Sequence, residues 1–309
     1  MKNVAITGVS GYIGSRLLLR LDTEDEVEKI IGIDIRPPNY NSQKLEFCHR
    51  DIASPLGDIF ADNNIDTAIH LAFVVKPSRN RNRSHEIDIG GTTNFLKACE
   101  QAKVEHILYP GSHTVYGAHP DNTQPLGEDS PLRPLHSFQY SRDKAEAERM
   151  FSDYATNHND ICMTILRSCP VIGPNASGSV IASMFQPVII RVAGYDPLLQ
   201  FVHEDDLTEV MVTVLKQKKS GVFNVAGDGH VLYSDIAGLY GKRNISLPGW
   251  LLRVVMGLSW RLHLQKESPP SGLEFIKYPP LVNTDKLKKE LGFGFNCSSR
   301  EALTSFINR

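Results

Sequence analysis

A tyrosine and a lysine stand four residues apart in QYSRDK (139–144). In a helix, Tyr140 and Lys144 lie on one face, because side chains at i and i+4 are neighbours. A phenol titrates near 10, too high for a base at neutral pH, and a nearby ammonium lowers that pKa. A tyrosine whose pKa is lowered in this way can take a proton from a secondary alcohol. The spacing alone arises by chance in roughly half of chains with this composition, so its meaning depends on the rest of the sequence.

A third candidate lies in GSHTVYG (111–117), which follows an apolar run. The Ser112 hydroxyl could hold the oxygen of a substrate, and Thr114 is its neighbour. A serine at the end of a strand is more often a turn residue, so Ser112 becomes a catalytic candidate only beside the Tyr–Lys pair.

Glycines at positions 8, 11 and 14 follow the strand pattern NVAIT (3–7) and open a helical pattern, in TGVSGYIG. Such a loop allows a tight turn, close approach of the backbone to a pyrophosphate, and close packing of helix on strand. The amides at the start of the next helix then point toward the phosphates. The loop therefore predicts a dinucleotide site, and no Lys-Ser or Lys-Thr follows it to indicate a Walker-type loop.

The second strand pattern ends in Asp34, twenty residues after Gly14. A carboxylate at this position accepts the ribose hydroxyls of NAD and repels the extra phosphate of NADP. Arg36 could bind that phosphate instead. The position of Asp34 favours NAD over NADP. With a nicotinamide cofactor, the tyrosine would remove a proton while hydride leaves the same alcohol carbon.

Short β-branched runs alternate with helical patterns through the first half of the chain. The strand candidates are 3–7, 29–34, 45–51, 67–72, 106–112 and 163–168, and the helical patterns are 12–22, 86–102 and 140–157. This alternation predicts an α/β fold, a Rossmann-type doubly wound parallel sheet. We expect residues 1–168 to form the NAD-binding domain and 169–309 a smaller, mixed substrate-binding region, with some segments returning to the Rossmann core.

These motifs together resemble the extended short-chain dehydrogenase/reductases, specifically the NAD-dependent epimerase/dehydratase family, over nearly the whole chain. TGVSGYIG, HRDI (49–52), HLA (70–72), SHTVYG, the Tyr-x-x-x-Lys pair, FVHEDDL (201–207) and FNVAG (223–227) are similar to family signatures. The resemblance implies catalysis by Ser112, Tyr140 and Lys144. It implies cofactor contacts by Gly8, Gly11, Tyr12, Ile13, Gly14, Asp34, Asp51, Ile52, Leu71, Ala72, Tyr140 and Lys144. It also implies a homodimer through the helices at 86–102 and 140–157.

Departures from the family pattern concern the substrate. Leu199 stands where many nucleotide-sugar enzymes of the family have an arginine that grips the substrate pyrophosphate, a bidentate contact that leucine cannot make. A second family arginine has no match in SGLEFIKYPP (271–280), where Lys277 is a point charge. Asp88 replaces a usual asparagine and Pro170 another. These changes favour a smaller or more apolar alcohol or ketone.

The basic loop KPSRNRNRSH (76–85) argues in the other direction, because it could receive an anionic substrate. We interpret it as a solvated, mobile loop. His203, Asp205 and Asp206 precede a helical run, and we interpret them as capping residues.

Composition narrows the class of protein. The chain has 309 residues with a formal net charge of −2, which gives no general attraction to nucleic acid or acidic membranes. Five cysteines without a Cys-x-x-Cys pair fit reduced thiols in a cytoplasm, and eleven histidines show no metal spacing. The longest apolar stretch, 248–262, is broken by two arginines and is interpreted as an amphipathic packing helix. We expect no metal, nucleic-acid or membrane partner.

The sequence thus predicts a cytoplasmic NAD-dependent oxidoreductase that acts on a secondary alcohol or ketone carbon of a sugar-like or other small hydroxy or keto substrate. Two alternatives remain open. One is a nucleotide-sugar 4-epimerase, which Leu199 disfavours, and the other is a non-catalytic NAD-binding scaffold or sensor.

Overall fold

A seven-stranded parallel sheet forms the centre of the computed structural model, which describes residues 1–176, 188–265 and 269–307. The strand order is β11-β6-β5-β4-β1-β2-β3, and every neighbouring pair is parallel. The strands are β1 (Asn3–Thr7), β2 (Lys29–Asp34), β3 (Leu45–His49), β4 (Thr67–His70), β5 (His106–Pro110), β6 (Cys162–Ser168) and β11 (Gly221–Val225). The predicted Rossmann-type doubly wound sheet is confirmed.

Three predicted strands end two residues earlier than expected, at His49, His70 and Pro110. The residues left outside them include Asp51, Leu71, Ala72 and Ser112, all of them candidates for the site. These residues therefore lie beyond the carboxyl ends of the strands, which is where ligands of open α/β sheets bind.

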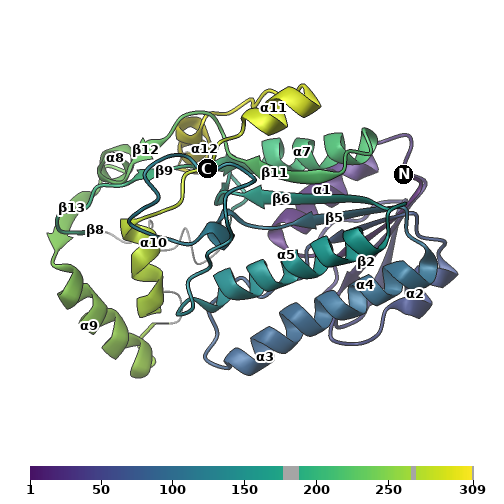
Figure 1. Ribbon diagram of the computed structural model, residues 1–309, viewed down its shortest axis with the longest axis horizontal. Helices are drawn as coiled ribbons and strands as arrows, with labels where there is room; N and C mark the ends of the chain where they lie inside the picture. Colours follow the sequence, from purple (N-terminus) through teal and green to yellow (C-terminus); the bar gives the residue numbers. More distant parts are fainter. Residues whose placement is uncertain (177–187, 266–268, 308–309) are drawn as a thin grey trace.

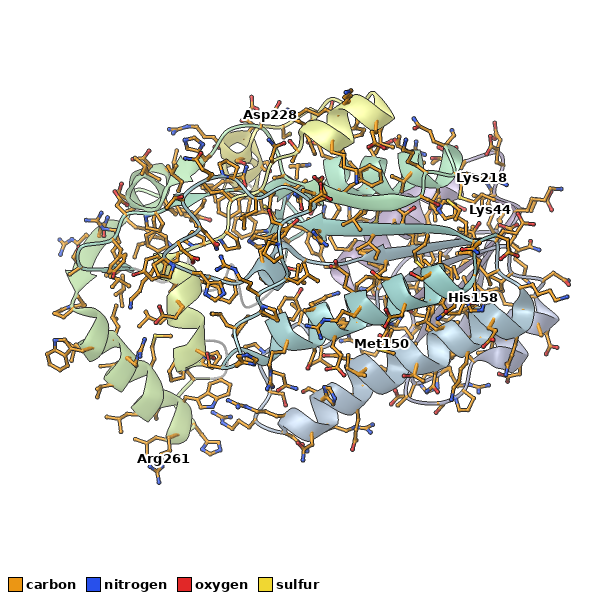
Figure 2. All side chains as sticks on the ribbon, viewed as in Figure 1. Lys44, Met150, His158, Lys218, Asp228 and Arg261 are labelled. Carbon is orange, nitrogen blue, oxygen red and sulfur yellow. The ribbon has the colours of Figure 1, made fainter. Side chains whose placement is uncertain are left out.

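Helices cover both faces of the sheet (Figure 1). On one face lie α1 (Tyr12–Asp22) and α7 (Glu204–Lys216), with α11 (Asp285–Leu291) at the β11 edge. On the other lie α2 (Gly57–Asp62), α4 (Gly91–Ala102) and α5 (Gln139–Asn157). Apolar side chains fill the space between the sheet and each layer (Figure 2).

The predicted helix 86–102 is part of a longer helical segment, residues 81–102, which has three consecutive pieces. A short helix, α3 (Arg81–His85), leads into a π-helical turn, η1 (Glu86–Gly90), and then into α4. Single π-helical turns inside α-helices frequently occur at functional sites, and this one carries the buried Asp88.

The C-terminal region is mixed. It contains three two-stranded ribbons: β7 (Val171–Ile172) with β10 (Val202–His203), β9 (Leu198–Leu199) with β12 (Val231–Leu232), and β8 (Val188–Val192) with β13 (Arg243–Leu247). Its helices are α8 (Tyr233–Leu239), α9 (Gly249–Arg261), α10 (Leu273–Lys277) and α12 (Ser299–Ile307). Although they follow residue 169, α7 and β11 belong to the central layers.

Candidate active site

The glycine loop connects β1 to α1 at the carboxyl edge of the sheet. Gly8 has a φ of +74°, and a Cβ there would lie 2.6 Å from the backbone nitrogen of Ala72. A Cβ on Gly14 would lie 2.8 Å from Val9 Cα. The fold itself therefore requires glycine at both positions.

Gly11 differs, because a Cβ there would meet only the Gly8 carbonyl oxygen, at 3.1 Å. It is the N-cap of α1 in an ordinary extended conformation. The packing of the fold therefore does not account for glycine at position 11. Close approach of a ligand to the backbone accounts for it better. The loop therefore fits the pyrophosphate of a dinucleotide at the N-terminus of α1.

Asp34 ends β2 beside this loop. Its carboxylate accepts hydrogen bonds from the backbone nitrogens of Ser10 (3.1 Å) and Arg36 (3.2 Å). The Arg36 side chain is exposed to solvent. The strand-end carboxylate is thus held by the glycine loop, in the position where the adenosine ribose of a dinucleotide binds in this fold.

Of the two residues after Gly11, Tyr12 points away from the loop toward the C-terminal region, where its hydroxyl donates to the buried Glu204. Glu204 also accepts from Asn175 and lies 3.6 Å from Arg16. Ile13 packs on the core beneath the sheet. Tyr12 therefore joins the glycine loop to the start of α7, and sequence reasoning did not identify its partner Glu204.

The remaining predicted cofactor contacts surround the loop. Asp51 accepts from the Ala53 nitrogen and lies 3.6 Å from Arg83. The buried Ile52 occupies the space that a Cβ on Gly91 would need. Leu71 and Ala72 bond Thr7 through their backbone nitrogens. All twelve residues assigned to the cofactor therefore lie at or next to the carboxyl ends of β1 to β5 or at the start of α5.

Ser112 and Tyr140 meet across the site. Ser112 is buried, caps the 3-10 turn His113–Tyr116, and accepts from the Thr114 hydroxyl at 3.0 Å. Tyr140 lies in the first turn of α5, close enough to Ser112 for that hydroxyl to lower the pKa of the phenol. The role expected for Ser112, to hold the oxygen of a substrate, stays a prediction.

Lys144 lies one turn further along α5 and is buried. Its ammonium donates to the Pro110 carbonyl at 3.0 Å and lies 3.9 Å from the centre of the Phe73 ring. The same Phe73 ring packs edge-on against Tyr140. The centre of the Tyr109 ring lies 4.8 Å from the same ammonium. The rings of Phe73 and Tyr109 and a backbone carbonyl therefore fix the position of the amine.

The electrostatics of the pair differ from the sequence-based expectation. Burial raises the pKa of Tyr140 to about 12; the neighbouring Ser112 hydroxyl opposes this rise and the charge of Asp88 adds to it. Burial likewise lowers the pKa of Lys144 to about 7. Desolvation is thus the largest influence on both groups, and Lys144 is not among the residues that lower the pKa of the phenol.

Asp88 is the third ionisable group of this cluster. Its carboxylate accepts from the Val74 nitrogen at 2.7 Å, and burial raises its pKa to about 7. The positive charge of Lys144 opposes that rise, and the charge of Asp88 in turn raises the pKa of Lys144. Asp88, which stands where the family usually has an asparagine, therefore interacts electrostatically with both Tyr140 and Lys144.

An open pocket lies beside Tyr140; its empty space of about 470 Å³ includes open solvent. Its lining is mixed: the apolar residues are Val74, Val75, Pro77, Phe138, Trp260 and Pro269, and the charged ones are Lys76, Arg81, Asp88 and Asp143. A site with both kinds of side chain can hold a small ligand that has an apolar body and a polar group.

The substrate-related departures lie around the C-terminal region. Leu199 packs in an apolar cluster with Phe201 and Val231. The Pro170 carbonyl accepts from the Val202 nitrogen. Lys277 lies 3.6 Å from Glu274, which offsets its charge. None of these three residues presents a cationic fork of the kind that binds a diphosphate.

The basic loop 76–85 is largely exposed, as interpreted, but two of its arginines have partners outside it. Arg79 stacks on Trp260 at 4.6 Å and donates to the carbonyls of Trp260 and Gln265. Arg83 pairs with Asp51 and Glu86. The expected mobility of the loop stays a prediction.

The acidic residues at the start of α7 have structural contacts, as interpreted. His203 caps α7 by accepting from the Asp205 nitrogen, Asp205 pairs with Arg16, and Asp206 accepts from the backbone nitrogens of Asn296 and Cys297.

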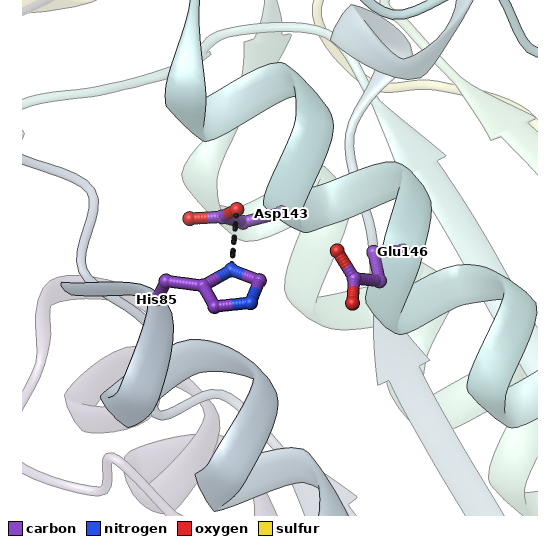
Figure 3. A group of neighbouring side chains, drawn as sticks. All are labelled: His85, Asp143 and Glu146. Atoms are coloured by element: carbon purple, nitrogen blue, oxygen red, sulfur yellow. Dashed lines mark hydrogen bonds and ion pairs between the residues drawn. The ribbon is translucent and has the colours of Figure 1, made fainter. Parts of the chain in front are cut away.

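His85, Asp143 and Glu146 form a cluster on α3 and α5 whose potential ligand atoms lie within 4.8 Å of one another (Figure 3). His85 Nδ1 and Asp143 Oδ1 are 3.0 Å apart, and the second Asp143 oxygen accepts from Gln139. Because both Asp143 oxygens are already engaged, we interpret the cluster as a hydrogen-bonded contact between the two helices.

Taken together, the parallel sheet, the glycine loop and the Ser–Tyr–Lys arrangement define a dinucleotide-dependent short-chain dehydrogenase/reductase. The sequence matches the NAD dependent epimerase/dehydratase family over residues 4–226, and the chain belongs to this family.

Relatives in sequence are distant. An uncharacterized protein of Mycobacterium tuberculosis is 24% identical over 317 residues, which cover 99% of this chain and 83% of that protein. Short-chain dehydrogenase/reductase family 42E member 1 of Homo sapiens is 26% identical over 252 residues, 76% of this chain and 63% of that protein.

Solved structures share the fold. MoeE5 in complex with UDP-glucose and NAD has a TM-score of 0.76 at 23% identity, covering 99% of this chain and 97% of its own. UDP-glucose 4-epimerase of Thermotoga maritima with UDP-glucose has a TM-score of 0.77 at 18% identity. The match covers 99% of this chain and 97% of that one. At these identities the likeness establishes the fold alone.

Proposed function

We propose that this chain is an NAD-dependent oxidoreductase that transfers hydride at a secondary alcohol or ketone carbon of a small substrate. The observation that carries the proposal is the arrangement of Tyr140, Ser112 and Lys144 beside the glycine loop. Neither the tyrosine nor the lysine has been lost, which argues against a non-catalytic scaffold or sensor.

The chain's own residues would divide the work as follows. Tyr140, protonated at neutral pH, donates its proton to the oxygen of a ketone, and in the reverse direction accepts the proton of an alcohol. Ser112 holds that oxygen and steadies the phenol. Lys144 would bind the nicotinamide ribose, as the family resemblance implies. When bound, NAD accepts or returns the hydride.

We propose NAD rather than NADP because the Asp34 carboxylate stands at the strand end and is held by two backbone nitrogens. Asp34→Ala should weaken the binding of NAD by about tenfold, since hydrogen bonds to charged groups contribute about 1.5–3 kcal/mol, and should weaken NADP less. Calorimetric titration with both cofactors measures this, with Arg36→Ala as the matched variant. Equal weakening of NAD and NADP would count against the assignment.

The substrate we propose is smaller or more apolar than a nucleotide sugar. The pocket beside Tyr140 has apolar as well as charged side chains, Leu199 is partly buried against an apolar cluster, and the charge of Lys277 is offset by Glu274. The rival function is a nucleotide-sugar 4-epimerase, favoured by the ligands of the structural neighbours. Tight binding of UDP by this chain would support that rival.

We further propose that residues 1–168 are mainly the cofactor domain and 169–309 mainly the substrate region. A homodimer would form through α4 and α5, which pack side by side. A cytoplasmic location is supported by the five free cysteines, none of which is in a disulfide.

The test of the proposed function is to denature the purified protein and identify any released nucleotide by mass spectrometry. A protein that releases no nucleotide but binds added NAD reversibly, and that reduces it with small secondary alcohols, supports an exchanging dehydrogenase. Near-stoichiometric NAD in the released fraction, together with tight UDP binding, contradicts it and supports the epimerase.

A further inference from the structure

Helix α9 turns an apolar face toward solvent. Trp250, Val254 and Leu258 are spaced four residues apart, and Trp250 is 70% exposed. Val255 and Leu262 lie on the same side, since steps of three and four residues share one helix face. The large apolar side chains exposed along this helix and just after it are Trp250, Val254, Val255, Leu258, Leu262 and Leu264.

Only the inner side of the helix packs on the protein. Leu252 is the one fully buried residue of α9, all of which the structure describes, and it contacts the cluster of Val192 and Leu273. The interpretation of 248–262 as a packing helix is therefore wrong for its outer face, because its apolar residues extend well around the helix.

The apolar surface continues onto the neighbouring ribbon. Ile190 of β8 and Ile245 of β13 are register partners, and both are exposed. In Figure 1, β8, β13 and α9 form one margin of the molecule. Exposed apolar side chains gathered on neighbouring elements commonly mark a docking surface.

The charged residues of β13, α9 and the segment after it have one sign. Residues 241–265 contain Lys242, Arg243, Arg253 and Arg261 and no acidic residue, in a chain whose net charge is −2. Arg253 pairs with Glu274. Arg243 and Arg261 are exposed, and Arg261 projects outward at the far end of α9 (Figure 2).

This charge pattern discriminates between possible occupants. In a two-fold symmetric dimer the same patch meets itself, so a second copy would bring basic groups against basic groups. An anionic phospholipid surface instead complements them, while its acyl region receives the apolar side chains.

We propose that the outer face of α9, together with Ile190 and Ile245, docks on the surface of an anionic phospholipid bilayer. The helix lies along the bilayer surface and does not cross it: its 13 residues span only about 20 Å. Among the described residues, no helix is long and apolar enough to span a membrane. This proposal replaces the expectation that the chain has no membrane partner.

Docking would bring the lipid surface close to the candidate active site. Trp260, on the inner side of α9, stacks under Arg79 and lines the pocket that also contains Tyr140. The docking proposal does not depend on what that pocket binds.

The test is flotation of the full chain with vesicles of phosphatidylcholine alone and with added phosphatidylserine. We expect flotation with the anionic vesicles, weakened by salt. The double variant Leu258→Glu with Leu262→Glu should lower the bound fraction by at least about tenfold, because two exposed apolar contacts are lost. Leu232→Glu, exposed on β12, is the matched control and should bind as the wild type does.

A second variant, Arg261→Glu, should weaken binding to anionic vesicles without affecting the fold, since the side chain is exposed. Circular dichroism checks that each variant is folded. Absence of flotation with any vesicle, equal binding to neutral vesicles, or unchanged binding by the double variant would overturn the proposal. So would a wild-type dimer that the double variant converts to a monomer, which would assign the face to a second copy.

Discussion

Two buried groups of charged side chains lie one turn apart on α5. In the first, the charge of Asp88 acts on both Lys144 and the phenol of Tyr140, whereas in the second Glu148 faces Arg167. All four charged residues are at most 5% exposed. The two groups therefore share an environment and differ in how their charges are compensated.

The charge of Arg167 is well compensated, although Glu148 Oε2 is buried without a hydrogen-bond partner among the described residues. The guanidinium donates through Nε and Nη2 to Glu148 Oε1 (2.9 and 2.6 Å) and through Nη1 to Tyr116 and the Glu128 carbonyl. Burial alone would lower the pKa of Arg167, but the bond to Glu148 and its charge raise it. The charged form is thus the stable one.

In the Lys144 group, burial shifts both partners toward their neutral forms, with pKa values of about 7 for Lys144 and about 7 for Asp88. Each of their side chains hydrogen-bonds a backbone group. The contrast indicates that the Arg167 group stabilises the fold, whereas the Lys144 group has ionisation states that a ligand or substrate can change.

Arg167→Met should have the largest effect. It leaves Glu148 buried without its partner, and removing one member of a buried ion pair costs about 3–5 kcal/mol. Urea unfolding measures the loss. Arg50→Met is the matched control: it breaks the exposed pair with Asp58 and should cost less than about 1 kcal/mol. Similar losses in the two variants would show that the Arg167 group does not stabilise the fold.

Lys144→Met should have the opposite effect: little change in stability and a large loss of turnover. Because burial already disfavours the charged amine, the free energy of unfolding should stay within about 1 kcal/mol of the wild type or increase. Turnover should fall by about a hundredfold. Urea unfolding and steady-state rates on one preparation measure both. A large loss of stability with little loss of rate would reverse the roles of the two groups.

Asp88→Asn should have the smallest effect, seen in pH dependence. The negative charge of Asp88 raises the pKa of Tyr140, so its removal favours the phenolate. Alcohol oxidation needs the deprotonated phenol, and its rate therefore increases with pH. In the variant this increase should occur at a lower pH than in the wild type, with a shift of less than about one pH unit.

The matched control for this shift is Glu86→Gln, which removes an exposed carboxylate from the same π-helical turn and should leave the profile unchanged. A profile of Asp88→Asn that is unmoved, or moved to higher pH, would show that Asp88 does not act on the phenol.

Sequence patterns were sufficient for the elements that position the site. The bounds of β1, β2 and α1 match the predicted ranges, because each has a continuous apolar or amphipathic run with a clear end. The order of the motifs also predicted that the glycine loop, Ser112 and Tyr140 come together, since the carboxyl ends of parallel strands share one edge.

The electrostatics could not be predicted in the same way. A spacing of four residues places Lys144 near Tyr140 but does not show that its amine turns to the Pro110 carbonyl among aromatic rings. The partners of Arg167 come from segments up to 51 residues away in sequence. The periodicity of α9 is the same whether its apolar face points inward or outward, so only the fold distinguishes the two.

The most direct test of the account is the comparison of Tyr140→Phe with the wild type in NAD affinity and turnover. The variant removes one hydroxyl from the Lys144 group and leaves the ring packed on Phe73. We predict a loss of turnover of about 10²–10⁴-fold with NAD binding and the free energy of unfolding nearly unchanged. Turnover at the wild-type rate would remove Tyr140 from the mechanism and contradict the assignment of this group to catalysis.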